Sequence, residues 1–259
     1  MRATRLYRVE AVVLKRIESR GADDIVILYT ANQGKLKAVA RGARRSESKL
    51  GGHVETITHG DMLLSQGHGS GFPIITQARM VDGFLPLRED LWRISSAMCA
   101  AEMVDRFAPE GESNFAMFQL LVDTLSWLCK VDDSQIPLLY FQLNLAGLLG
   151  YRPQLLNCVC CEGTLQPISI FFSSSAGGVL CPSCCNREIG TCSLSVDALK
   201  VLRFFQNNNL PSACRLRISA ELRSELQQLL QGYIRYVLEQ EVRSLRWMDR
   251  LRNESCAAL

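Results

Sequence analysis

The chain has 259 residues, of which 47% are hydrophobic and 21% charged, a composition typical of a folded protein with one large or two modest domains. Its formal net charge is only +3, and its longest apolar stretch, residues 138–151, is interrupted by Gln142 and Asn144, so we expect no membrane span. Eleven cysteines and no hydrophobic signal stretch near the N-terminus predict a cytoplasmic protein whose thiols stay reduced.

The charge is distributed unevenly along the chain. Residues 1–50 contain twelve Lys or Arg against five Asp or Glu, whereas residues 51–185 contain six against thirteen. Residues 186–259 are slightly basic again, with eleven against eight. A basic N-terminal segment joined to an acidic middle segment suggests that the first part of the chain binds a polyanion.

The first eighty residues have the sequence features of short β-strands separated by turns. The separators are rich in Gly, Asn and Asp, as in Asn32-Gln-Gly34 and Gly67-His-Gly-Ser-Gly71. The five predicted strands are residues 7–17, 25–31, 35–42, 53–66 and 73–84. Five short antiparallel strands in this length predict a small closed barrel, and the OB-fold is the commonest barrel of this kind.

A cluster of positive charge lies in the third predicted strand and directly after it. Lys35, Lys37 and Arg41 are expected to share the outer face of the strand, because side chains alternate with a period of two. The candidate nucleic-acid-binding residues are Lys35, Lys37, Arg41, Arg44, Arg45 and Lys49. A solvated charged face is the alternative, but this concentration favours a surface that follows a phosphate backbone without reading bases. Tyr7 and Tyr29 could stack on bases or lie in the core.

From about residue 86 the apolar residues recur three and four positions apart, which predicts helices. The expected helices are residues 87–108, 115–130, with Ser113 as its cap, 136–150, 195–206, and a last helix from 219. Residues 136–150 are apolar nearly all round, as in a helix buried in a bundle. The last helix is expected to carry one apolar stripe that runs from Leu222 through Tyr233 to Leu245.

Two cysteine pairs interrupt this helical region, in the pattern C-x2-C-x19-C-x2-C. Two thiolates separated by two residues can face the same ion, and a second pair completes a tetrahedron, so the pattern predicts one structural zinc ion. The predicted ligands are Cys158, Cys161, Cys181 and Cys184. A disulfide pair or ordinary buried thiols are the alternatives, and Cys160 or Cys185 could replace a neighbouring ligand.

These elements together predict an α+β fold: an N-terminal five-stranded OB-fold barrel, then an α-helical domain with an inserted four-cysteine zinc module. The expected boundaries are residues 1–82 for the barrel and 157–190 for the zinc module. Residues 83–156 and 191–259 are the two parts of the helical domain.

The sequence predicts a protein that is not an enzyme and that has no catalytic residues and no small-molecule substrate. His53-Val-Glu55 and Cys181-Pro-Ser-Cys184 have a superficial likeness to the signature of zinc deaminases. However, the proline lies inside the cysteine pair, and the other pair already completes the tetrahedron. The glycine run at residues 67–71 is not followed by Lys-Ser/Thr, as a phosphate-binding loop requires.

Several segments resemble the bacterial RecO recombination mediators, over nearly the full length of the chain. The most specific is Gly34-Lys-Leu-Lys-Ala-Val-Ala-Arg-Gly-Ala-Arg-Arg45. Also similar are Ile25-Val-Ile-Leu-Tyr-Thr30, Phe84-Leu-Pro-Leu-Arg-Glu-Asp-Leu91 and Leu148-Leu-Gly-Tyr-Arg-Pro153.

The resemblance implies a non-enzymatic role in DNA repair by homologous recombination. Such proteins bind single- and double-stranded DNA, anneal complementary strands, contact the single-strand-binding protein SSB and, with RecR, help to load the RecA recombinase. The resemblance implies that the six cations correspond in position to the DNA-binding surface of the family. It also implies that the four cysteines correspond to the metal ligands of the family. The alternative is a zinc-containing OB-fold protein that binds RNA and has no recombination partners.

Overall fold

The computed structural model describes residues 5–66, 71–166, 169–187, 190–239 and 242–257. The chain divides into two compact units, residues 1–130 and 131–259. The finer division predicted from the sequence stays a prediction. Among the described residues, every helix is too short or too polar to cross a membrane.

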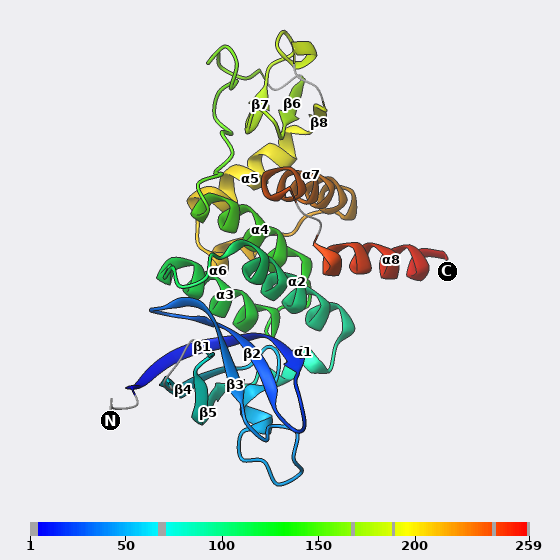
Figure 1. Ribbon diagram of the computed structural model, residues 1–259. Helices are drawn as coiled ribbons and strands as arrows, with labels where there is room; N and C mark the ends of the chain where they lie inside the picture. Colours follow the sequence, from blue (N-terminus) through cyan, green and yellow to red (C-terminus); the bar gives the residue numbers. More distant parts are fainter. Residues whose placement is uncertain (1–4, 67–70, 167–168, 188–189, 240–241, 258–259) are drawn as a thin grey trace. The chain divides into compact units, whose positions relative to one another are not determined.

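The first unit begins with a closed five-stranded barrel (Figure 1). Its strands are β1 (Arg5–Glu18), β2 (Asp24–Thr30), β3 (Gly34–Ala40), β4 (His59–Gln66) and β5 (Ile74–Asp82). They follow the order β1-β2-β3-β5-β4 around the barrel, with antiparallel neighbours except for the short parallel contact of β3 with β5. This is the OB-fold that the turn spacing predicts.

The fourth strand is shorter than predicted. It begins at His59 and not at His53, because Gly51–Val54 form a short 3-10 helix, η1. The barrel core is made by the inward positions of all five strands, as the period of two requires. Its fully buried members include Val13, Leu28, Ala38, Ala40, Leu64 and Ile75.

Three helices complete the first unit: α1 (Leu85–Arg88), α2 (Leu91–Phe107) and α3 (Phe115–Leu128). The single helix predicted over 87–108 is wrong, because Asp90 takes an extended conformation and caps α2 by accepting the backbone N–H groups of Trp92 and Arg93. Asn114, and not Ser113, caps α3 through a hydrogen bond from the Met117 N–H.

Gly34, the first residue of β3, brings the α2–α3 connection against the barrel. Its φ is +65°, and a Cβ there would collide with the backbone carbonyl of Glu112. The N–H of Gly111 also donates to the carbonyl of Lys35 at 3.0 Å. The acidic residues of this connection therefore lie beside the basic strand.

The second unit contains the helices α4 (Gln135–Leu148), α5 (Val196–Asn207), α6 (Leu210–Ala213), α7 (Ala220–Leu238) and α8 (Arg243–Ala257). As predicted from its apolar surface, α4 is buried, and it packs against α5, α6 and α7.

The single long last helix predicted from the sequence is wrong. Glu239 takes the left-handed conformation after Leu238, and α8 begins at Arg243, so Leu245 belongs to a separate helix.

The cysteine segment contains a small sheet that the sequence did not predict. Its order is β7-β6-β8, formed by β6 (Ile170–Ser173), β7 (Gly178–Leu180) and β8 (Cys192–Leu194), and the short helix η2 (Cys185–Arg187) lies between β7 and β8. Gly178 lets the chain at Gln154 approach β7 closely, because a Cβ at Gly178 would collide with the Gln154 carbonyl.

Candidate metal centre and nucleic-acid interface

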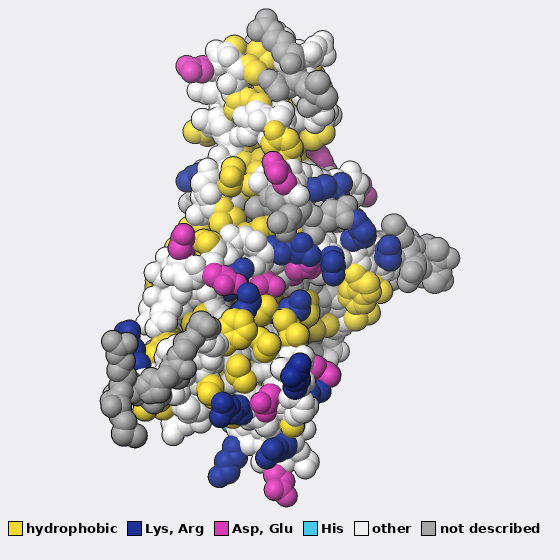
Figure 2. All heavy atoms as spheres, viewed as in Figure 1, with side chains coloured by type: hydrophobic (Ala, Val, Ile, Leu, Met, Phe, Trp, Pro, Cys, Tyr) yellow, Lys and Arg dark blue, Asp and Glu magenta, His cyan; other side chains and the backbone are white. Residues whose placement is uncertain are grey.

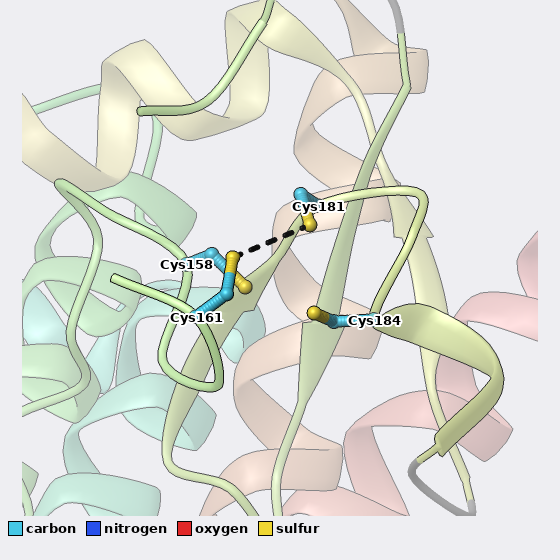
Figure 3. A group of neighbouring side chains, drawn as sticks. All are labelled: Cys158, Cys161, Cys181 and Cys184. Carbon is cyan, nitrogen blue, oxygen red and sulfur yellow. Dashed lines mark hydrogen bonds between the residues drawn. The ribbon is translucent and has the colours of Figure 1, made fainter. Parts of the chain in front are cut away.

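The four predicted cysteine ligands lie together in the second unit. Their Sγ atoms are all within 4.8 Å of one another, and the Sγ atoms of Cys161 and Cys181 are 3.8 Å apart. Figure 3 shows the four sulfurs converging from two loops. A regular tetrahedron with metal–sulfur bonds of ~2.3 Å requires sulfur–sulfur distances of about 3.8 Å. The donor set therefore fits one metal ion.

Local backbone hydrogen bonds shape the two cysteine turns. The N–H of Cys184 donates to the carbonyl of Cys181 at 3.0 Å, and the N–H of Glu162 donates to the carbonyl of Cys158 at 2.9 Å. The first turn is joined to β7 by a 2.9 Å bond from the N–H of Val159 to a β7 carbonyl. Because β7 runs directly into the second turn, this bond aligns the two pairs.

The hydrogen bonds of the cluster shift the pKa values of two of its thiols. Burial disfavours the Cys158 thiolate, but the backbone N–H groups of Cys181, Cys161 and Cys160 outweigh burial and lower the pKa of Cys158 to about 6. A hydrogen bond with Cys181, together with burial, raises the pKa of Cys184 to about 12. Hydrogen bonds thus move the pKa values of these two thiols in opposite directions. Because a metal ion binds the thiolate form of cysteine, binding would release the remaining thiol protons.

The two extra cysteines lie outside this group of four. Cys160 is exposed, and the sulfur of Cys185 donates to the carbonyl of Pro182 at 3.1 Å. All four clustered residues are free thiols, not disulfides. The geometry thus brings together the four ligands that the spacing predicts.

The six candidate nucleic-acid-binding cations divide into two groups, and the two strand lysines belong to the paired group. The Nζ of Lys35 donates to the backbone carbonyl of Asp105 and lies 3.8 Å from its carboxylate. The Nζ of Lys37 lies 2.6 Å from the carboxylate of Glu110. The outer face of β3 is therefore neutralised by acidic residues of α2 and of the α2–α3 connection.

Arg44 is also paired, with a carboxylate inside the barrel wall. Its Nε lies 3.3 Å from the side chain of Asp24, which is fully buried, and its Nη1 lies 2.7 Å from Glu18. Arg16 pairs with the other oxygen of Asp24. Burial would lower the pKa of Arg16, but its bonds to Asp24 and the charge of Glu55 raise it. Two arginines thus compensate one buried charge, so Arg44 has a structural role.

Arg41, Arg45 and Lys49 form the second group, which we call the free cations. All three are exposed in the connection between β3 and η1, and within the described ranges none forms an ion pair or a side-chain hydrogen bond. Arg41 follows Ala40, the last residue of β3, so the expectation that it shares the outer face of the strand is wrong. Figure 2 shows Lys and Arg side chains over this end of the barrel, with acidic side chains among them.

The two tyrosines considered for base stacking lie in or against the barrel core. Tyr29 is fully buried, and burial raises its pKa to about 12, while Tyr7 packs against the core cluster. An aromatic residue that the sequence analysis missed is Phe72, which is 47% exposed and has the Nζ of Lys37 at 6.0 Å from its ring centroid. The sequence feature that could have indicated Phe72 is an aromatic residue between Gly71 and Pro73, just outside a predicted strand.

The fold and the cysteine cluster define an OB-fold protein whose second, largely helical unit carries four thiols placed to hold a metal ion. Two family models match the chain: Recombination protein O N terminal over residues 1–84, and Recombination protein O C terminal over residues 88–246. The chain therefore belongs to the RecO family of DNA repair recombination mediators, as the sequence resemblance predicted.

Individual relatives are similar over nearly their whole length, and each is named DNA repair protein RecO. The relative from Dehalococcoides mccartyi (strain CBDB1) is 37% identical over 246 residues, which cover 95% of this chain and 96% of the relative. The relative from Roseiflexus sp. (strain RS-1) is 39% identical over 248 residues, covering 96% and 87%. The relative from Symbiobacterium thermophilum is 35% identical over 251 residues, covering 96% and 98%.

Proposed function

We propose that this protein is a non-enzymatic, cytoplasmic recombination mediator that binds single- and double-stranded DNA and anneals complementary strands. It works with SSB and RecR to promote RecA loading, and its four-cysteine centre holds a structural zinc ion. The observation that carries the proposal is the match of both RecO family models, which together span residues 1–84 and 88–246. The four-thiol donor set suits zinc, since soft thiolates in a tetrahedron select it over harder cations.

Within the six predicted cations, we assign the largest share of the DNA contact to the three free cations. A phosphate can approach Arg41, Arg45 or Lys49 without displacing any carboxylate, whereas Lys37 must first leave Glu110. Contacts of this kind are electrostatic and independent of base sequence. The affinity for DNA should therefore fall as the salt concentration rises.

The first test replaces all three free cations. We expect Arg41→Ala/Arg45→Ala/Lys49→Ala to bind single-stranded DNA about tenfold to fiftyfold more weakly in fluorescence anisotropy. The slope of log affinity against log salt should become shallower by about two, since three counterion-releasing contacts are lost. The matched control is Lys200→Ala/Arg215→Ala/Arg217→Ala, which removes three exposed charges from the second unit. Equal losses in both triple variants would contradict this assignment.

The mediator role is tested by strand annealing with the unmodified protein. We expect faster annealing of complementary oligonucleotides that are coated with SSB, and slower annealing with the triple variant. Preferential binding to RNA, with no effect on SSB-coated DNA, would instead support the RNA-binding alternative.

Glu110, the acidic partner of Lys37, is expected to compete with DNA phosphates for this lysine. Its hydrogen bond with Lys37 lowers the pKa of Glu110, so Glu110 is ionised at neutral pH and occupies the lysine. We therefore expect Glu110→Gln to raise the affinity for single-stranded DNA about twofold to fivefold, because the exposed pair is weak and a phosphate can replace it. The control is Glu112→Gln, two residues away, whose carboxylate forms no ion pair with Lys35 or Lys37 among the described contacts. An unchanged affinity in titrations of Glu110→Gln would contradict the competition.

A further inference from the structure

Phe72 lies in the connection between β4 and β5, with nearly half of its surface exposed to solvent. A single exposed apolar residue is ordinary on a protein surface and by itself indicates nothing. Two further observations distinguish Phe72: the backbone around it is held in place, and a cation lies beside its ring.

The backbone on both sides of Phe72 is bonded to the barrel. The carbonyl of Pro73 accepts the N–H of Val39 at 2.8 Å, and Val39 is the β3 residue that pairs with Ile74 at the start of β5. On the other side, the Nε2 of Gln66 donates to the carbonyl of Gly71 at 3.2 Å. The backbone that carries the aromatic side chain is therefore held next to β3.

The cation over one face of the ring is Lys37, on the outer face of β3. Its Nζ lies 6.0 Å from the ring centroid of Phe72 and 2.6 Å from the carboxylate of Glu110. An exposed aromatic ring and an ammonium group at this spacing are complementary to the two parts of an unpaired nucleotide, its flat base and its phosphate.

We propose that Phe72 and Lys37 form a subsite for one unpaired nucleotide, in which the base stacks on the face of the Phe72 ring opposite Lys37. This inference rests on the proposed DNA-binding function and adds the residue that distinguishes a single strand from a duplex. OB-folds bind oligonucleotides on the face of strands 2 and 3 and at the connection between strands 4 and 5. Here Lys37 lies in β3, and Phe72 lies in the described part of the β4–β5 connection. A duplex keeps its bases stacked on one another, so the Phe72 ring favours single strands only.

The test compares Phe72 variants on single strands and duplexes by anisotropy. Stacking on one aromatic side chain contributes about 1–3 kcal/mol per base. We therefore expect Phe72→Ala and Phe72→Leu to weaken binding of an oligothymidylate at least about fivefold, and binding of a duplex less than twofold. Phe72→Tyr retains the ring and should retain the affinity. The control is Phe115→Ala, another exposed phenylalanine of the first unit.

An oligonucleotide made only of abasic deoxyribose phosphates separates stacking from charge. The unmodified protein and Phe72→Ala should bind it equally, because it offers phosphates but no bases. An unchanged preference for single strands in Phe72→Ala, or an equal loss for the abasic strand, would overturn the stacking proposal while the DNA-binding function stands. Failure of the unmodified protein to bind any of these DNAs would overturn both.

Discussion

A Cys158→Ser variant is expected to bind no zinc ion and to lose the ordered structure of the small sheet β6–β8. The side chain of Cys158 is buried, and its sulfur is one of four that converge within 4.8 Å. The three strands of this sheet have four residues or fewer each, which is too little to be stable without another source of free energy. Binding of structural zinc contributes on the order of 10 kcal/mol to such segments.

Metal analysis by mass spectrometry and hydrogen exchange of the purified chain measure both parts of this prediction. We expect about one zinc ion per chain in the unmodified protein and rapid exchange at β6 and β7 in Cys158→Ser. Cys160→Ser is the matched control, since Cys160 lies in the same turn but outside the group of four, and it should keep the ion. Full zinc occupancy in Cys158→Ser, or loss of zinc in Cys160→Ser, would show that the ligand set is different.

The Arg44→Ala variant is expected to lower the free energy of unfolding by about 2–3 kcal/mol, because it leaves the buried Asp24 with only one arginine partner. Arg45→Ala is the control, because this neighbouring arginine makes no ion pair with a described residue; there we expect less than about 0.5 kcal/mol. Urea unfolding followed by circular dichroism measures both values. Equal stability of the two variants would contradict a structural role for Arg44.

This distinction changes how DNA-binding mutants of the basic segment are interpreted. A variant that lacks both Arg44 and Arg45 would lose an ion pair to the buried Asp24 together with an unpaired cation. Weaker DNA binding by that variant would not by itself identify a DNA contact. For this reason the triple variant that tests the DNA surface leaves Arg44 in place.

Local patterns in the sequence were sufficient for the elements that depend on near neighbours in the chain. The two cysteine turns are formed by hydrogen bonds between residues three or four positions apart, so the C-x2-C spacing alone predicted the cluster. The five strands follow from alternation and from turn residues. The helix ends were predicted less well, since Asp90 and Glu239 break helices whose apolar pattern continues through them.

The family, the barrel, the buried helix α4 and the four clustered thiols thus follow from residue patterns along the chain. Which cations remain available to a polyanion depends instead on how distant segments pack. Lys35 pairs with Asp105 and Lys37 with Glu110, each about seventy residues further along the chain, and Arg44 meets Asp24 across the barrel wall. No local pattern encodes such contacts, because they depend on how distant segments pack, as at Gly34 and Glu112. For the same reason Phe72 became a candidate only when folding brought it beside Lys37.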